Sequence, residues 1–178
     1  MTMIKAAFNE GCELKALVIS AFPGCGKTHF FNRHKEYMRV LDSDSSMFSW
    51  IYNDDGAKER HPDFPDNYIR HIKENLDIQD IIFVSSHAQV RKALHDAGIE
   101  FVLVFPSTDL KEQWLWRLHD RGSSEEFVDL IRINWDRWLK ECYDDTLASG
   151  KYLLTKIQPY ITDLVIQNIS RQEIIEHR

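Results

Sequence analysis

The stretch SAFPGCGKT, residues 20–28, decides how the rest of the sequence is interpreted. A short apolar run precedes it and a segment with helical character follows it. A glycine-rich turn between a strand and a helix is the context of a phosphate-binding loop, in which N–H groups around Gly24 and Gly26 form an anion-binding nest at the helix N-terminus. Ala21 stands where this pattern usually has glycine. The alternative is an ordinary Gly/Pro turn.

The loop pattern assigns a role to each of its side chains and backbone groups. Lys27 is predicted to reach the β- and γ-phosphates of ATP, and the Thr28 hydroxyl to bind Mg²⁺. The residues predicted to bind ATP are Pro23, Gly24, Cys25, Gly26, Lys27, Thr28 and His29.

Composition places the 178-residue chain among single-domain globular proteins, since 43% of its residues are hydrophobic and 28% are charged. The net charge of −6 provides no overall attraction for a nucleic-acid backbone, although it leaves a local basic groove open. The three cysteines (Cys12, Cys25 and Cys142) lack metal-type spacing and favour a reduced protein. With only short apolar runs, we expect a cytoplasmic protein without a membrane span.

Alternating apolar runs and helical periodicities predict an α/β fold with a roughly five-stranded parallel sheet and helices on both faces. Strands are expected at 16–20, 38–41, 81–84, 101–105 and 152–157. Helices are expected at 29–37, 47–52, 67–76, 88–97, 110–119, 125–143 and from 162 onward, with a loop at 53–66 and an unassigned arm at 1–13. Polar clusters follow several strands and should converge at the carboxyl edge of the sheet.

The phosphate loop, the acidic run 42–44 and the arginine pair Arg117/Arg121 together resemble the small P-loop kinases. These include nucleoside-monophosphate kinases, shikimate and gluconate kinases, polynucleotide 5′-kinase domains and kinase-like phage proteins of nucleotide metabolism. The resemblance covers about residues 16–163, but only the loop is a specific motif. It implies a three-layer P-loop NTPase fold with its core at about 14–165, a substrate-binding insertion at 45–76, a lid at 111–126, and ATP and Mg²⁺ as cofactors.

The resemblance also implies a role for Asp42, which lies 15 residues after Lys27. An acidic residue here orients or deprotonates an acceptor hydroxyl, or holds Mg²⁺. A phosphate acceptor needs no general base, and Asp42 would then be a metal or positioning residue. Alternatively, this Asp/Ser run, Asp44 included, forms turns and helix caps.

Arg117 and Arg121 share one face of the expected helix, because they are four residues apart. Guanidinium groups suit the charge of a transferring phosphoryl group, and the resemblance places the pair in the lid. A solvated helix face that pairs with nearby acids is the alternative.

The acceptor side is expected from residues 47–70 and from the polar run after the third strand. The predicted substrate-binding residues are Asp44, Tyr68, Arg70 and His87. Arg60 and Tyr52 are also available, and Phe48 and Trp50 either stack on a base or belong to the core. His87 either contacts phosphate or is structural, and Trp114, Trp116, Trp135 and Trp138 are expected in the core. The resemblance suggests adenine binding at 158–163.

The sequence therefore predicts ATP-dependent phosphoryl transfer to a small acceptor, with a (deoxy)nucleoside monophosphate as the first choice. A hydroxyl acceptor (a nucleic-acid 5′ end, a modified base or a metabolite) is the alternative. The acidic net charge counts against a polynucleotide, whereas the pair Asp42/Asp44 counts for a hydroxyl. A nucleotide-binding regulatory protein without transfer activity remains a third reading, against which Lys27 and Thr28 argue.

Overall fold

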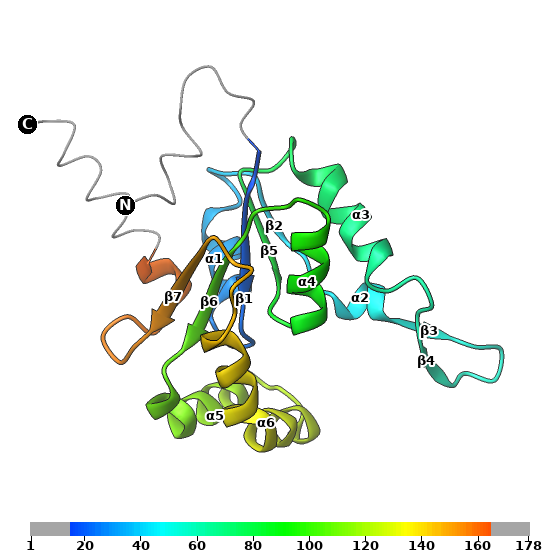
Figure 1. Ribbon diagram of the computed structural model, residues 1–178. Coiled ribbons are helices and arrows are strands. Elements are labelled where there is room, and N and C mark those ends of the chain that lie inside the picture. Colours follow the sequence, from blue (N-terminus) through cyan, green and yellow to red (C-terminus); the bar gives the residue numbers. More distant parts are fainter. Residues whose placement is uncertain (1–14, 165–178) are drawn as a thin grey trace, which may run out of the picture.

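Five parallel strands in the order β2-β5-β1-β6-β7 form the central sheet (Figure 1). The computed structural model describes residues 15–164. The strands are β1 (Leu17–Ala21), β2 (Val40–Asp42), β5 (Ile81–Ser85), β6 (Val102–Pro106) and β7 (Gly150–Leu154). The last residue of the central strand β1, Ala21, is level with Ser85 and Val104 of its neighbours. The carboxyl ends of β1, β5 and β6 therefore lie side by side.

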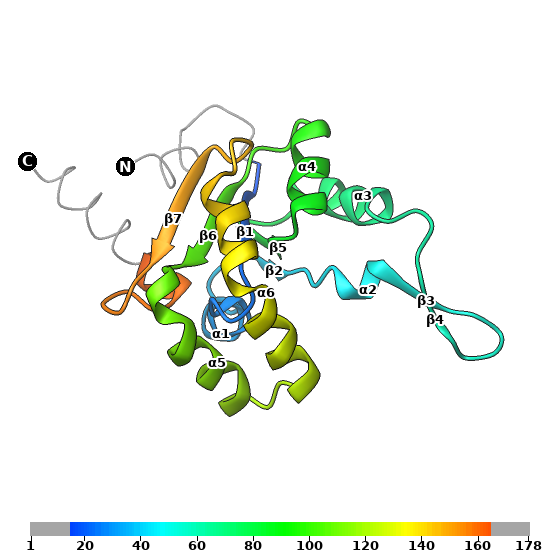
Figure 2. The ribbon, with the colours of Figure 1, turned by 60° about the horizontal axis from the view of Figure 1, so that its bottom comes forward.

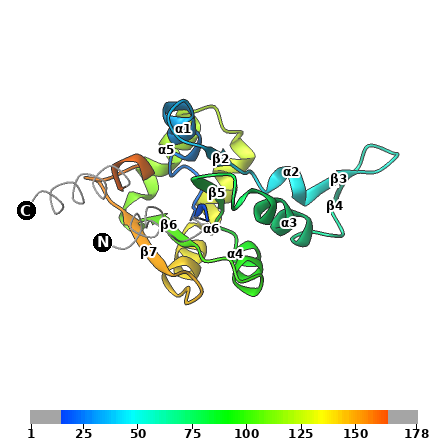
Figure 3. The same cartoon turned by 90° about the horizontal axis from the view of Figure 1, so that it is seen from above.

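Helices cover both faces of the sheet, and α1 and α4 lie on opposite sides of it (Figure 3). The helices are α1 (Lys27–His34), α2 (Ser46–Ser49), α3 (Asp66–Asn75), α4 (Ala88–Asp96), the 3-10 turn η1 (Thr108–Leu110), α5 (Lys111–Asp120) and α6 (Glu125–Tyr143). One core cluster joins the sheet to α1, α5 and α6, and a second joins it to α3 and α4. This arrangement confirms the predicted α/β class.

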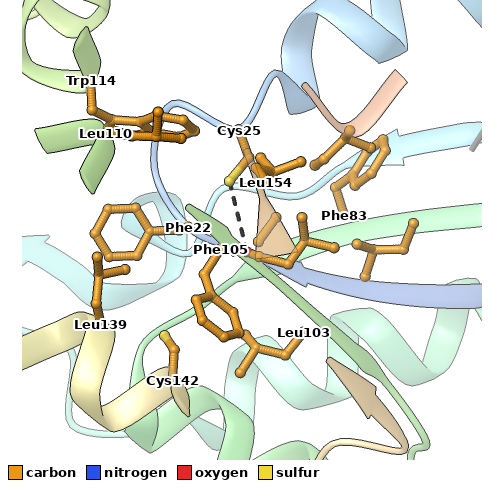
Figure 4. Packing of buried hydrophobic residues seen from close by; sticks show 14 of the residues in the cluster. Phe22, Cys25, Phe83, Leu103, Phe105, Leu110, Trp114, Leu139, Cys142 and Leu154 are labelled. Atoms are coloured by element: carbon orange, nitrogen blue, oxygen red, sulfur yellow. Dashed lines mark hydrogen bonds between the residues drawn. The ribbon is translucent and has the colours of Figure 1, made fainter. Parts of the chain in front are cut away.

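The core explains why the strands read as continuous apolar runs. All five residues of β6 and four of the five in β5 are buried, as expected for parallel strands covered on both faces. Trp114 and Trp135 are fully buried, and the ring of Phe22 meets Trp135 edge-on at 5.8 Å. Figure 4 shows Trp114 and Phe22 among the packed side chains of this core. The prediction that these two tryptophans lie in the core is thus confirmed, whereas Trp116, also predicted in the core, is exposed.

The prediction for residues 47–66 was wrong in part. The helix expected at 47–52 is only the single turn α2, and residues 50–52 form strand β3 (Trp50–Tyr52). It pairs antiparallel with β4 (Lys58–Arg60), inside the segment predicted to be a loop. The β-prone triplet Trp-Ile-Tyr and the turn at Gly56, whose φ is 76°, favour this hairpin over a helix. Figure 2 shows the hairpin projecting away from the sheet.

The remaining predicted elements are present, with boundaries shifted by up to three residues. The last strand begins at Gly150 rather than at residue 152 and ends at Leu154, and the first helix begins at Lys27 rather than at residue 29. The arm at 1–13 and most of the helix expected from 162 onward lie outside the described residues. Within residues 15–164, no helix has the length and apolar character needed to cross a membrane.

A buried ion pair ties α4 to the segment that follows α6. Arg91 Nε donates to Asp145 Oδ2 at 2.7 Å, and both side chains are only 4% exposed. Arg91 also donates to the carbonyls of Ser86 and Glu141, and the other carboxylate oxygen of Asp145 accepts two backbone N–H groups. Each buried charge is therefore compensated, which is the condition under which such a pair is tolerated in a core.

Replacing Asp145 by Asn should lower the free energy of unfolding by about 3–5 kcal/mol, because Arg91 would keep its buried charge without a counter-ion. Urea denaturation measures this loss. Asp96→Asn is the control: it breaks the exposed pair with Lys92 and should cost about 0.5 kcal/mol.

The same variant has a predicted pH dependence. Burial raises the pKa of Asp145, but hydrogen bonds from Arg91 and the backbone outweigh it and hold the pKa below its usual value. The folded state thus favours the charged carboxylate of Asp145. This preference stabilises the fold above a pH of about 4, and the stabilisation is lost at lower pH as the carboxylate becomes protonated. The stability difference between wild type and Asp145→Asn should therefore narrow as the pH falls. A difference that stays constant down to acid unfolding would contradict the assignment.

Candidate active site

The phosphate loop occupies residues 22–26, between β1 and α1, at the carboxyl edge of the sheet. Gly24 and Gly26 have φ angles of 86° and 96°, in the left-handed region that favours glycine. Space is restricted as well, since a Cβ on Gly24 would lie 2.7 Å from Trp114 Nε1. Both backbone geometry and packing therefore require glycine at position 24.

Three consecutive carbonyls of the loop, those of residues 23–25, accept hydrogen bonds from surrounding elements. Trp114 Nε1 donates to the first at 2.7 Å, Arg117 Nη1 to the second at 3.3 Å, and the N–H of Ile161 to the third at 3.0 Å. The carbonyl and N–H of a trans peptide group point in opposite directions. Fixing these carbonyls outward therefore turns the N–H groups of residues 24 and 26 toward the inside of the loop.

The N-terminus of α1 completes an anion-binding cradle. Gly26 is the N-cap residue, no described side chain caps the helix, and its first turn contains no acid. The N–H groups of Lys27, Thr28 and His29 have no intrahelical acceptor, and the helix dipole adds partial positive charge here. A bound phosphate would satisfy these groups.

The Cys25 side chain takes no part in the cradle. It is fully buried and points into the core, with Sγ 3.7 Å from the carbonyl of Val104 (Figure 4). Burial raises the pKa of its thiol to about 12, so the group stays protonated. Cys25, predicted to bind ATP, offers only backbone atoms to a ligand.

Lys27 is folded back onto the loop, with Nζ donating to the carbonyl of Ala21 at 3.0 Å. Burial lowers the pKa of Lys27, and the nearby carboxylates of Asp42 and Asp44 oppose that shift. An arriving phosphate would offset the same desolvation cost. Lys27 is therefore placed at the base of the cradle, beside two acids.

Thr28 and Asp42 lie in direct contact, with Oγ1 donating to Oδ2 at 2.7 Å. Both were predicted Mg²⁺ ligands, from the start of α1 and the end of β2. No group of three or more His, Cys, Asp or Glu side chains within residues 15–164 forms a protein-only metal cage. One hydroxyl and one carboxylate beside a phosphate cradle fit Mg²⁺, which usually keeps several waters and takes its other ligands from phosphate.

The two arginines of the expected lid have different surroundings. Arg117 is half-buried between the rings of Trp114 and Tyr160, 4.2 Å from each, and donates to the carbonyls of Gly24 and Pro159. It thus supports the outer wall of the phosphate loop. Arg121 is exposed and donates to the Ser123 hydroxyl.

The helix that carries both arginines is packed into the protein. Trp114, Leu115 and Leu118 of α5 are buried in the core cluster shared with α6. The first part of the expected lid is therefore anchored to the core along one face, while Trp116 on its other face is exposed. Residues 119–122, at the end of α5 and beyond it, are all exposed.

Asp44 and Tyr68 both take part in holding the loop after β2. The exposed Asp44 accepts the N–H of Ser46 at 2.9 Å and so supports the start of α2. Tyr68 is fully buried, and its hydroxyl donates to the carbonyl of Ser43 at 2.8 Å. Tyr68 was predicted to bind substrate, but here its hydroxyl is used within the protein. It positions the backbone between Asp42 and Asp44.

His87 follows β5 at the same edge of the sheet and meets the ring of Trp138 at 6.2 Å. Partial burial, together with the positive charges of Arg60 and Lys27, lowers the pKa of His87. The ring is therefore neutral at pH 7 and suited to hydrogen bonding rather than to ion pairing.

Arg70 is not brought to this site. It lies on the exposed side of α3 and lines a surface groove of 580 Å³ between α3 and α4, which none of the phosphate-loop residues line. Arg60, named from the sequence as an available arginine, donates instead to Gln89 Oε1 at 3.1 Å, two residues after His87. The hairpin brings Arg60 to this position, and no local sequence pattern indicates the direction in which the hairpin points.

No family model and no curated protein matches this sequence. Among solved structures, shikimate kinase from Acinetobacter baumannii in complex with shikimate has a TM-score of 0.44 and 16% sequence identity. That match covers 89% of this chain and 94% of the kinase. The similarity is too low to assign roles to individual residues, so any function of this chain must be argued from its own residues.

Gly24→Ala should abolish ATP binding or weaken it at least about tenfold, because a Cβ would push Trp114 away from the loop. Gly98→Ala is a matched control, since Gly98 also has a positive φ (69°) but has open space around it. That control should lose about 1 kcal/mol of stability and bind ATP normally. Isothermal titration calorimetry compares the two. Equal affinities would show that the loop geometry does not depend on glycine at position 24.

Proposed function

We propose that the protein is an ATP- and Mg²⁺-dependent phosphotransferase. One observation carries this proposal: the Thr28 hydroxyl meets the Asp42 carboxylate directly beside the phosphate cradle and Lys27. A hydroxyl, a carboxylate and a lysine grouped around free helix N–H groups are the parts that phosphoryl transfer requires. A simple anion site would need neither the acid nor its contact with Thr28.

In this proposal each residue has a defined task. The N–H groups at the start of α1 hold the β-phosphate, and Lys27 exchanges the Ala21 carbonyl for phosphate oxygens. Thr28 and Asp42 would hold Mg²⁺, which when bound would supply positive charge for the phosphate oxygens. Because the transfer itself needs little covalent chemistry from the protein, alignment of donor and acceptor supplies most of the rate enhancement.

The adenine ring is proposed to lie beside Arg117 and Tyr160. The ring of Tyr160 lies next to Gly26, at 3.2 Å from the position of a Cβ there, and the Arg117 guanidinium is stacked on it. Arg117 is covered by Trp114 and Tyr160 on its two sides, so the stacking surface proposed at the outer end of the cradle is the part of the Tyr160 ring that stays exposed. The predicted segment 158–163 includes Tyr160.

The acceptor is proposed to lie on the other side of the cradle, among Asp44, His87 and Arg60. A nucleoside monophosphate is the first candidate, because Arg60 offers a guanidinium for its phosphate and Trp50 an aromatic ring for its base. A nucleotide hydroxyl is the second candidate. It is favoured by Asp44, a second carboxylate at the site that remains for proton transfer when Asp42 holds Mg²⁺.

Lys27→Ala should reduce phosphoryl transfer from γ-labelled ATP at least about 100-fold, because the lysine charge on the transferring group is lost. The assay offers ribo- and deoxynucleoside monophosphates, including 5-substituted pyrimidines, and a 5′-hydroxyl oligonucleotide. Lys35→Ala, at the exposed far end of the same helix, should leave the rate unchanged. If wild type binds ATP and labels no acceptor, the transferase proposal is wrong.

Asp42→Asn should raise the Mg²⁺ concentration needed for half-maximal ATP binding about tenfold or more, because a charged ligand becomes neutral. Asp44→Asn is the comparison, since its carboxylate supports α2 and is not paired with Thr28. Titration of Mg²⁺ against a fluorescent ATP analogue measures both. Equal shifts in the two variants would exclude Asp42 as the specific ligand.

A further inference from the structure

The β3–β4 hairpin projects away from the body of the protein (Figures 1 and 2). All six of its strand residues are exposed. Tyr52 is 72% and Trp50 39% exposed, although large aromatic rings are normally covered. Exposed aromatic side chains gathered on one element indicate a binding surface.

Strand register sorts these side chains onto two faces of the hairpin. Trp50 pairs with Arg60 and Tyr52 with Lys58, so these four share one face, which we term the aromatic-basic face. Lys58 Nζ lies 4.7 Å and the Arg60 guanidinium 5.3 Å from the centre of the Trp50 ring. Ile51 and Glu59 lie on the opposite face. The strand carboxylate is therefore kept apart from the two cations.

The aromatic-basic face is continuous with the proposed acceptor site. The Arg60 guanidinium is stacked at 4.2 Å on Phe64, at the body end of the hairpin, and donates a hydrogen bond to Gln89, two residues after His87. From Phe64 outward, rings and cations alternate through Arg60, Trp50 and Lys58. An acceptor beside His87 thus has a stacking surface leading away from it.

A second surface begins at the same point. Gln89, which accepts a hydrogen bond from Arg60, also lines the groove between α3 and α4. The basic side chains of that groove are Arg70, Lys73 and Lys92, and its acids are Asp66 and Asp96. Arg60 therefore meets the body of the protein at the edge of a groove that carries charges of both signs.

We propose that the aromatic-basic face binds single-stranded nucleic acid and that the acceptor nucleotide belongs to that strand. Trp50 and Tyr52, two residues apart on a strand, are separated by about 6.7 Å, which is about two base steps. Proteins that bind single strands without recognising their sequence stack the bases on aromatic rings and bind the phosphates with cationic side chains. The acidic chain as a whole, and Asp54 and Asp55 at the tip, confine this binding to a short stretch.

The part of this proposal that concerns the acceptor rests on the proposed function, whereas binding to the face does not. Binding is therefore measured without ATP, by fluorescence anisotropy of labelled single-stranded DNA and RNA oligonucleotides at low salt. We expect saturable binding that weakens steeply with salt. Trp50→Ala and Tyr52→Ala should each weaken it at least about fivefold. Ile51→Ala, on the opposite face, should change it less than about twofold.

The proposal is overturned if no saturable binding is seen, or if Ile51→Ala weakens binding as much as Trp50→Ala does. It is also overturned if light scattering shows a stable dimer that Trp50→Ala converts to monomer, because the face would then bind a second copy of the chain. Lys27→Ala should bind the oligonucleotide with wild-type affinity and transfer no phosphate. If wild type labels mononucleotides but not the bound oligonucleotide, the assignment of the acceptor to the strand is wrong, while the kinase proposal stands. If it labels nothing, the kinase proposal fails and the binding result stands independently.

Discussion

The phosphate loop depends on three hydrogen bonds that hold its carbonyls outward. Their donors, Trp114, Arg117 and the N–H of Ile161, come from α5 and from the segment after β7, each far from the loop in sequence. A glycine-rich loop alone is conformationally free, and ordering it costs entropy. In this protein the loop is already ordered before a ligand binds, because Trp114, which holds one of its carbonyls, is buried in the core. The cradle is therefore preorganised, which favours both binding and catalysis.

The proposed donor and acceptor sides of the site differ in how they are built. The donor side is formed by the first residues of α1, the end of β2 and α5, all attached to the buried sheet. The acceptor side depends on α2 and the hairpin, which project from the body and whose strand residues are exposed (Figure 2). Few buried contacts mean low local stability, so this side is the one able to adjust to an acceptor. Tyr68, which holds the backbone at Ser43, joins the two sides.

Local patterns were enough to predict the sheet and the glycine turn between β1 and α1. The strands are buried on both faces and read as apolar runs, and the spacing of Lys27 and Asp42 placed the acid at the end of β2, where Asp42 meets Thr28. The hairpin was missed because the aromatic-rich segment 47–52 was interpreted as one helix, whereas its second half is the β-prone triplet Trp-Ile-Tyr. The direction in which the hairpin carries Arg60 could therefore not be predicted. The contacts of Arg117 with Tyr160 join distant segments, which no spacing rule reveals.

The most direct test of the account is a crystal structure of the full chain with Mg²⁺ and a non-hydrolysable ATP analogue. We predict the β-phosphate within hydrogen-bonding distance of the N–H groups of residues 26–28, Lys27 Nζ moved from the Ala21 carbonyl to the phosphates, and Mg²⁺ bound to Thr28 Oγ1 beside Asp42. The carbonyls of residues 23–25 should keep their present partners. A nucleotide bound elsewhere, or a loop that must break its bonds to Trp114 and Arg117 to admit phosphate, would contradict the account.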